Sequence, residues 1–263
     1  MLSDARVMVT GASRGIGAVL ARELAGRGSR LALVARDAAA LDAVAADCRG
    51  ADVYEADLAE PANIEPLVAR VGADGPIDVL VNNAGVDLTG RLWRLPARDI
   101  ERLIAVNLVA PMLLCRAVIP SMLARGRGHM VNVSSLAGTN ALPGVAPYSA
   151  SKAGLSHFTA CLRAELKGTR VTTTLVEIGP VESDMMDSLR AHGPTRRAVE
   201  RLARLRLSYD LPMTEVVAAI VDAVERRRRH VRLPRRNLAF PLLVEAPRRM
   251  TEWLLAGTDP RKD

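Results

Sequence analysis

The chain is poor in aromatic residues, cysteine and histidine, and these shortages limit the make-up of its core and argue against disulfides and metal sites. Aromatic residues make up only 3% of its 263 residues, so the core must be built from Ala, Val, Leu and Ile. The three cysteines are scattered, without a CxxC pair or a histidine at ligand spacing, and the four histidines do not cluster. We therefore expect no metal site and no disulfide framework, and we place the chain in a reducing, cytoplasmic compartment.

Uninterrupted apolar runs and a signal peptide are missing as well. The longest apolar stretch, residues 103–123, is broken by polar and helix-disturbing residues at Asn107, Pro111, Arg116 and Pro120. A membrane-spanning helix needs about 20 predominantly apolar residues, so we do not expect this stretch to be one. No signal peptide precedes the first expected strand, which begins near Arg6.

Excess positive charge is confined to the C-terminal part of the chain. Residues 190–263 hold 17 basic and 9 acidic residues, a net charge of +8, whereas residues 1–189 have a net charge of −1. Nucleic-acid binding is not expected, because no recognised module or interleaved aromatic residues accompany the basic run. Apolar residues between 240 and 255 leave two readings open, a membrane-surface contact or packing over the pocket or a second subunit. Packing is favoured, since prolines interrupt this tail.

Short β-rich runs alternate with amphipathic stretches along most of the chain. Strands are expected at 7–10, 31–35, 52–56, 79–82, 130–134 and 171–177, and helices at 16–28, 37–49, 61–72, 97–124, 148–167 and about 214–229. Several strands are apolar on both faces, which is typical of a parallel sheet covered by helices. We predict a single α/β domain over residues 1–263 with a Rossmann-type doubly wound parallel sheet and helices on both faces. Residues of about 179–213 would form a substrate-binding loop region, and about 230–263 a basic and apolar tail.

A glycine-rich turn follows the first expected strand and opens the first expected helix. Gly11, Gly15 and Gly17 give the spacing GxxxGxG. Glycines at such a position allow a tight turn and a close approach of the backbone to a pyrophosphate at the helix N-terminus. A glycine turn alone is a weak signal for nucleotide binding, but its place between strand and helix makes it a strong one.

Tyr148 and Lys152 lie four residues apart, about one helical turn, so both project from the same helix face. A phenol has an ordinary pKa of about 10, and a cation one turn away favours the phenolate and adjusts the group for proton transfer. Lysine supplies only three of the 36 basic residues, which makes Lys152 informative. The alternative, an ordinary pair on a helix surface, is outweighed by the other motifs.

Five motifs in order resemble the short-chain dehydrogenase/reductase family: Gly11-x3-Gly15-Ile16-Gly17, Asn82-Asn83-Ala84-Gly85, Asn107, Ser135 and Tyr148-x3-Lys152. The similarity covers residues of about 3–185. It implies that Tyr148 is the general acid/base and that Lys152 lowers its pKa and binds the nicotinamide ribose. Ser135, thirteen residues before the tyrosine, would orient the substrate in preference to Ser134. Asn107 would hold a water of the proton relay, and an amide that satisfies a helix kink is compatible with that role.

The resemblance also implies a dinucleotide site at the strand ends. Its residues would be Gly11, Ser13, Arg14, Gly15, Ile16, Gly17, Arg36, Asp57, Leu58, Asn83, Ala84, Gly85, Tyr148, Lys152, Gly179, Pro180, Val181 and Ser183. Asp57 and Leu58 match the pair that contacts adenine. Ile178-Gly179-Pro180 replaces the usual Pro-Gly after the sixth strand, and Ser183 stands where a threonine commonly contacts the carboxamide.

Cofactor choice depends on the end of the second strand. NAD-preferring relatives carry an acid there, which binds the ribose 2′-hydroxyl and would repel a 2′-phosphate. This chain has Ala35 followed by Arg36, with Arg14 inside the glycine turn, and these two guanidiniums favour NADP(H) over NAD(H). Asp37 comes one place too late and is expected to cap the next helix.

The predicted function is NADP(H)-dependent oxidoreduction between a lipophilic ketone and a secondary alcohol. A non-catalytic dinucleotide sensor would have no need for the proton-relay residues, and a family epimerase or dehydratase would carry a longer substrate domain after residue 180. The family's acyl-carrier reductases carry a Gly-Gly signature near the C-terminus, and this chain has none. Both an acyl-carrier-bound substrate and the tetramer of those reductases are therefore in doubt. We expect a cytoplasmic homo-oligomer, a dimer rather than a tetramer, with peripheral membrane contact through the tail as the open alternative.

Overall fold

The computed structural model describes residues 2–140, 142–182, 195–196, 200–201, 204 and 209–234. Seven parallel strands form one sheet in the order β3-β2-β1-β4-β5-β6-β7. The strands are β1 (Arg6–Thr10), β2 (Arg30–Ala35), β3 (Asp52–Glu55), β4 (Val79–Asn82), β5 (Gly128–Ser135), β6 (Val171–Ile178) and β7 (His230–Leu233). The predicted doubly wound parallel sheet is confirmed.

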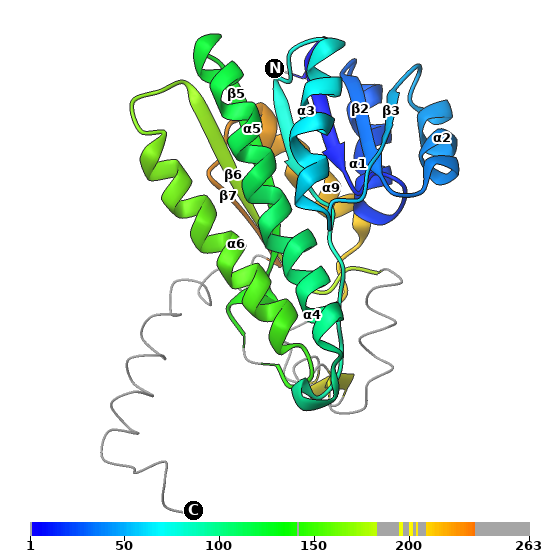
Figure 1. Cartoon of the computed structure of the whole chain (residues 1–263), viewed down its shortest axis with the longest axis vertical. Coiled ribbons are helices and arrows are strands. Elements are labelled where there is room, and N and C mark those ends of the chain that lie inside the picture. Colours follow the sequence, from blue (N-terminus) through cyan, green and yellow to red (C-terminus); the bar gives the residue numbers. More distant parts are fainter. Residues whose placement is uncertain are drawn as a thin grey trace, which may run out of the picture.

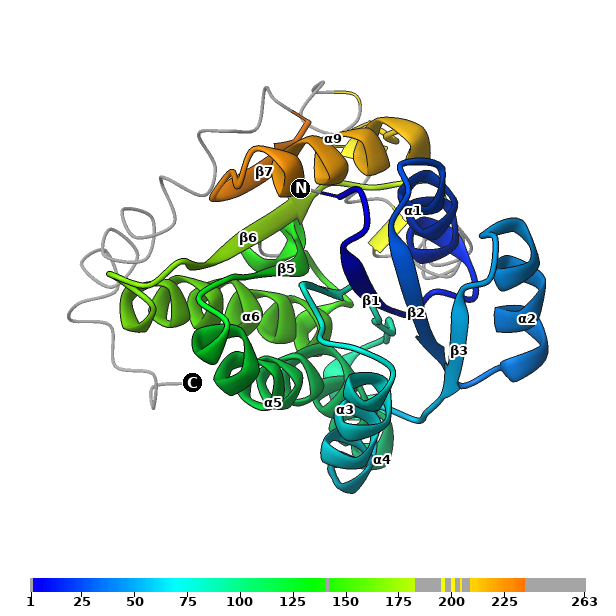
Figure 2. The same cartoon turned by 90° about the horizontal axis from the view of Figure 1, so that it is seen from above.

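Helices cover both faces of the sheet (Figures 1 and 2). One face carries α1 (Gly15–Gly26), α2 (Ala38–Asp47) and α9 (Met213–Glu225), and the other carries α3 (Ile64–Ala73), α5 (Ala110–Ala124) and α6 (Ala146–Glu165). Short 3-10 turns occur at Pro61–Asn63, Leu92–Arg94 and Leu136–Gly138. Strand β1 serves both cores, because Val7 and Val9 pack toward α1 while Met8 packs toward α5. Burial on both faces explains its continuous apolar sequence.

The helix expected over residues 97–124 is divided into α4 (Ala97–Ile104), a π-helical turn (Ala105–Val109) and α5. By length and composition alone, Ala97–Ala124 could cross a membrane. In the structure its inner side is buried, with Leu103, Leu114 and Met122 at 0% exposure. That burial is the behaviour of a core helix, and it agrees with the expectation that this stretch is not a membrane span.

The seventh strand was not predicted. The sequence pattern predicts a helix to about residue 229 and a tail from about 230, whereas α9 ends at Glu225 and residues 230–233 form β7, which pairs in parallel with β6. Val231 and Leu233 are buried while His230 is exposed, so a two-residue alternation was present in the sequence. The strand has only four residues and follows four arginines, which hid the pattern. The rest of the predicted tail, residues 235–263, lies outside the described residues.

The strand order reverses between β1 and β4, since the chain runs to β2 and β3 on one side and to β5, β6 and β7 on the other. Crossover helices on opposite faces leave a crevice at the carboxyl ends of these two strands. The loops after β1, β4 and β5 and the start of α6 meet at this edge (Figure 1). The fold therefore brings the predicted motifs to one place.

Candidate active site

A cleft with a volume of about 900 Å³ lies at the carboxyl ends of the strands. Of the residues predicted for the site, those lining it are Gly11, Ser13, Arg14, Gly15, Ile16, Arg36, Asp57, Leu58, Asn83, Ala84, Gly85, Ser135, Tyr148, Lys152, Gly179, Pro180 and Val181. Gly17 and Asn107 are buried just behind this lining. Ser183 lies outside the described residues.

The glycine turn is built for close backbone packing. Gly11 has φ +65°, and a Cβ at this position would lie 2.7 Å from the Cα of Ala84. A Cβ at Gly17 would lie 2.1 Å from the carbonyl oxygen of Gly11. The turn thereby brings the N-terminus of α1 to the cleft without a capping side chain. The unpaired N–H groups of that first helical turn suit a pyrophosphate, so the residues present fit a dinucleotide.

Thr10 and Asn83 join the glycine turn to the loop after β4. The Thr10 hydroxyl accepts hydrogen bonds from the backbone N–H of Asn83 and of Ala84, both at 3.1 Å. Asn83 Nδ2 donates to the carbonyl oxygens of Thr10 at 3.0 Å and Gly11 at 3.2 Å. These bonds hold two sides of the cleft together. Thr10 was not among the predicted site residues, although it is the first residue of the glycine motif.

Positive charge marks the end of the cleft beside β2 and β3. Ala35 and Arg36 line it, and Asp37 caps α2 by accepting a hydrogen bond from the N–H of Ala40 at 3.0 Å, as predicted. Asp57 accepts a hydrogen bond from Arg102 at 2.8 Å. Burial raises the pKa of Asp57, but hydrogen bonds from Ala59 and Arg102 and the charge of Arg36 bring it below its ordinary value.

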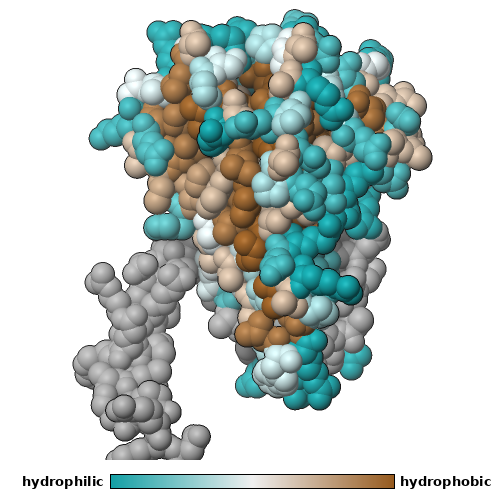
Figure 3. Space-filling view, viewed as in Figure 1, coloured by the Kyte–Doolittle hydropathy of each residue, from teal (hydrophilic) through white to brown (hydrophobic). Residues whose placement is uncertain are grey.

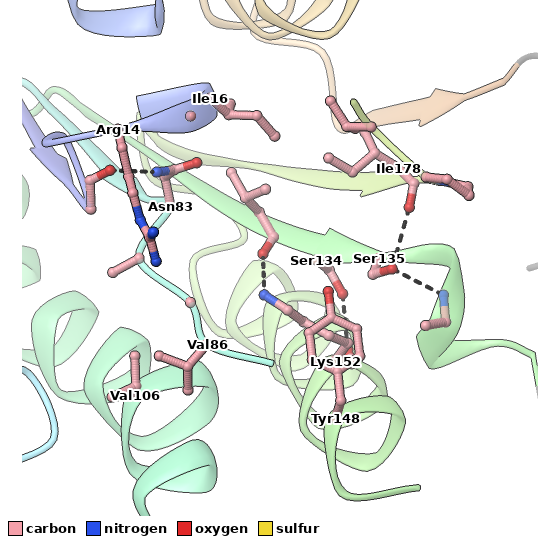
Figure 4. Close-up of a pocket in the computed structure, with 18 of the residues that line it drawn as sticks. Arg14, Ile16, Asn83, Val86, Val106, Ser134, Ser135, Tyr148, Lys152 and Ile178 are labelled. Atoms are coloured by element: carbon pink, nitrogen blue, oxygen red, sulfur yellow. Dashed lines mark hydrogen bonds between the residues drawn. The ribbon is translucent and has the colours of Figure 1, made fainter. Parts of the chain in front are cut away.

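The second guanidinium of the predicted pair, that of Arg14, also lines the cleft. Figure 4 shows the Arg14 side chain running from the glycine turn past Asn83. Its charge opposes the rise that burial causes in the pKa of Asp87, which lies in the loop after β4. A joint role of Arg14 and Arg36 at a 2′-phosphate stays a prediction.

Tyr148, Lys152 and Ser135 meet at the other end of the cleft (Figure 4). The proline in the first turn of α6 suits a helix start; Tyr148 follows it directly and Lys152 lies one turn later, with exposures of 9% and 5%. Lys152 Nζ donates to the carbonyl oxygen of Val133 at 3.0 Å and lies 5.8 Å from the centre of the Tyr148 ring. The helical spacing argument is thus confirmed in its geometry.

Burial controls the ionisation of both groups. It raises the pKa of Tyr148 to about 12, against a hydrogen bond with Ser135 that lowers it, and the charge of Asp87 adds to the rise. It lowers the pKa of Lys152 to about 8. We expected the neighbouring cation to lower the pKa of the phenol. In the protein the pKa of the phenol is raised instead, because desolvation disfavours the charged form of each group.

The two neighbouring serines have different surroundings. Ser135 Oγ accepts from the N–H of Ala137 at 3.1 Å and donates to the Ile178 carbonyl at 3.3 Å, and its hydroxyl lies close enough to Tyr148 to lower the pKa of the phenol. Ser134 is buried under α6, where it donates to the backbone carbonyl of Lys152 at 2.9 Å. The serine beside the phenol is the one that spacing predicted.

Asn107 is fully buried within the π-helical turn. Its Oδ1 accepts from the N–H of Val86 at 2.9 Å, and its Nδ2 donates to the Val86 carbonyl at 2.8 Å and to Ser151 Oγ at 3.2 Å. The side chain therefore ties the loop after β4 to helix α6. The two expected roles of Asn107, holding a water of the proton relay and satisfying a helix kink, stay predictions.

Comparison with known proteins identifies the family. Residues 5–193 match the family model described as short chain dehydrogenase. The chain belongs to the short-chain dehydrogenase/reductase family. It is therefore an oxidoreductase, as predicted from its motifs.

Two curated relatives show the range of this similarity. The chain is 36% identical to the ketoacyl reductase HetN of Nostoc over 190 residues, which cover 70% of this chain and 66% of that protein. It is 30% identical to dehydrogenase/reductase SDR family member 7B of Rattus norvegicus over 244 residues, which cover 88% of this chain and 74% of that protein.

Solved structures of short-chain dehydrogenases with bound nicotinamide cofactors share the fold. A metagenomic oxidoreductase in complex with NADP is 40% identical with a TM-score of 0.66 and coverage of 77% of this chain and 92% of that one. An enzyme of Sphingobium yanoikuyae with NADPH is 30% identical with a TM-score of 0.78 and coverage of 98% of both chains. One from Burkholderia phymatum with NAD is 26% identical, with a TM-score of 0.79 and coverage of 100% and 99%.

The catalytic end of this oxidoreductase has an apolar lining that the sequence reasoning did not identify. Tyr148 packs in a cluster with Leu103 and Val145, and Val86 and Leu142 pack against it. Further unpredicted lining residues are Val106, Leu136, Ala137, Asn140, Ile178, Glu182, Thr195 and Met213. The run of small and apolar residues between Ser135 and Tyr148 was a usable signal for part of this set. The described residues include no group of three or more acidic, cysteine or histidine side chains that could hold a metal ion.

Proposed function

We propose that this short-chain dehydrogenase is an NADP(H)-dependent carbonyl reductase or alcohol dehydrogenase acting on a lipophilic ketone or secondary alcohol. The observation that carries the proposal is the arrangement of one cleft. The glycine turn and Arg36 lie at one end, and Ser135, Tyr148 and Lys152 lie at the other, inside an apolar lining. Nicotinamide dinucleotide, when bound, supplies or accepts the hydride.

Each catalytic side chain has a role that its contacts support. Tyr148 holds its proton at neutral pH, since its pKa is about 12, and it donates that proton to the substrate oxygen during reduction. Ser135, hydrogen-bonded to the phenol, orients the same oxygen. Lys152 is fixed by the Val133 carbonyl, and its Nζ faces Gly85, where Asn107 Oδ1 also lies. It holds the ribose and provides positive charge beside the proton-transfer group.

NADP(H) is the proposed cofactor because no acid stands at the end of β2. Ala35 occupies that place, and Arg36 beside it is available for a 2′-phosphate. Asp37 is engaged as the cap of α2, and Asp57 as the partner of Arg102. The NADP and NADPH complexes of two structural relatives support the choice, while the NAD complex of a third shows that the fold accepts both cofactors.

The substrate is proposed to be lipophilic, since Val86, Leu142 and Val145 surround Tyr148. A homodimer in the cytoplasm, with the tail packed on the protein, remains our prediction for assembly and location. An apolar band over α5 and α4 in Figure 3, with Leu123 42% exposed, supports a subunit contact there. The tail itself lies outside the described residues, and its alternative as a membrane contact is tested by vesicle binding of a chain truncated after residue 236.

The function is tested by three single substitutions, assayed with NADPH and a panel of ketones at the nicotinamide absorbance. Tyr148→Phe keeps the ring but removes the proton, so kcat should fall by on the order of 10² or more while NADPH still binds. Ser135→Ala should also impair turnover. Ser134→Ala is the matched control, and its effect should be much smaller. A Tyr148→Phe variant with near wild-type turnover, or the reverse ranking of the serines, would show that the residues are wrongly assigned.

A further inference from the structure

A buried polar row crosses three strands beneath the catalytic helix. Ser134 on β5 is the register partner of Glu177 on β6, and Glu177 is the register partner of Arg232 on β7. Glu177 Oε2 accepts a hydrogen bond from Arg232 Nε at 2.7 Å. Glu177 has 2% exposure, so a charged carboxylate is held inside the sheet.

The row continues into α6 through one serine. Ser156 Oγ lies 3.4 Å from Glu177 Oε1, to which it donates, and 2.9 Å from Ser134 Oγ. Ser134 donates to the backbone carbonyl of Lys152 at 2.9 Å, so the two hydroxyl protons are used by the bonds to Glu177 and to Lys152, and the two serine oxygens are in contact without a hydrogen bond between them. The row from the edge strand therefore reaches α6 at Ser156, one turn after Lys152.

A buried ion pair at this place requires an explanation. Moving two charges out of water costs more than an apolar pair of the same size, and such pairs contribute little net stability. On its own face of the sheet Glu177 lies between Ser134 and Arg232, with Ser156 of α6 over it, so the carboxylate has polar neighbours on three sides. A buried polar network of this kind fixes the relative position of the elements it joins. Here it joins β7 and β6 to the helix of the active site.

We propose that Glu177, held by Arg232, is a positioning residue of the reaction. Through Ser156 it fixes the height of α6 over the sheet, and thereby the distance of Tyr148 and Lys152 from Ser135. Ser135 is the last residue of β5, and it donates to the carbonyl of Ile178, the residue directly after Glu177. Ser135 and the Tyr148–Lys152 pair therefore both belong to elements that this row joins. The inference rests on the proposed function, which assigns these residues their roles.

The test compares two ion-pair variants of the full chain. Glu177→Gln keeps the size of the side chain and an acceptor for Ser156 but removes the charge that holds Arg232. A displacement of catalytic groups by less than 1 Å is costly, so kcat should fall about tenfold while the KM for NADPH stays within about twofold. Amide hydrogen exchange at residues 149–156 should accelerate. Arg232→Lys, which keeps the charge, should retain more activity than Arg232→Gln.

The matched control is Asp78→Asn. Asp78 directly precedes the central strand β4, at the amino ends of the strands, and pairs with Arg125 at 2.7 Å, both side chains being partly buried. This variant should lose stability without changing kcat or the exchange of α6 amides. Wild-type kcat and exchange in Glu177→Gln, or an equal loss of kcat in Asp78→Asn, would overturn the proposal. If Tyr148→Phe retained full activity, the proposed function would fail, while the exchange comparison would still decide whether Glu177 anchors α6.

Discussion

Replacement of Gly17 by alanine tests most directly whether the close packing of the glycine turn is needed for cofactor binding. A methyl group there would lie 2.1 Å from the Gly11 carbonyl oxygen and 2.7 Å from Asn83 Nδ2, closer than real Cβ atoms approach. Neither neighbour can yield freely, because one is backbone and the other donates two hydrogen bonds to the glycine turn. Helix α1 or the turn must move by roughly 1 Å, a form of overpacking that costs about 1–3 kcal/mol.

We expect a loss near the upper end of that range. At about 2–4 °C per kcal/mol for a chain of this size, the Tm should fall by roughly 6–12 °C. The same shift separates the N-terminus of α1 from the loop after β4, so the Kd for NADPH should rise at least about tenfold. Thermal unfolding and a fluorescence titration with NADPH measure the two effects.

Gly26→Ala is the matched control within the same helix. A Cβ at Gly26 would have nothing within 4 Å. The substitution should leave NADPH binding unchanged and raise stability by about 0.5–1 kcal/mol, because alanine loses less entropy in a helix than glycine. If Gly17→Ala kept the wild-type Tm and Kd, the close packing of the turn would not be needed for cofactor binding.

Two further predictions concern charge. Ala35→Asp combined with Arg36→Ser should reverse the preference from NADPH to NADH in kcat/KM, since each lost charge-assisted hydrogen bond is worth about 1.5–3 kcal/mol; equal use of both cofactors by the unmodified protein would contradict the argument. Burial lowers the pKa of Lys152 to about 8, so its ammonium form is present below that pH and is lost above it. The kcat/KM for ketone reduction should therefore decline as the pH rises through about 8. A decline only near pH 10 would show that Lys152 keeps its ordinary pKa.

The sequence predicted the parts of the fold that depend on local pattern. Apolar runs such as the one in β1 have no polar alternation, so they identify strands buried on both faces. The position of Asp37 directly before a helical pattern predicted a cap, and the structure contains that bond. The thirteen-residue spacing from Tyr148 selected Ser135, which is the serine that lies beside the phenol and lowers its pKa.

Properties that depend on tertiary surroundings could not be predicted in the same way. Strand β7 exists because β6 offers it an edge, and its four residues alone carry a weak pattern. The charge of Arg14 affects the pKa of Asp87, a residue in a different loop. The polar row through Glu177 joins residues from three strands and a helix, which no spacing along the chain reveals.

The pKa of Tyr148 is the most instructive disagreement, because it bears on the direction of catalysis. Sequence spacing places a cation one turn away and predicts a lowered pKa, but burial removes water from both groups and favours their neutral forms. A phenol with a pKa of about 12 is ready to donate a proton at neutral pH. Oxidation of an alcohol instead requires the phenolate, whose formation at pH 7 costs about 1.4 kcal/mol for each pH unit below the pKa. On the proposed role of Tyr148 we therefore expect oxidation to gain relative to reduction as the pH rises, and the ratio of the two kcat values measured between about pH 6 and pH 10 checks this.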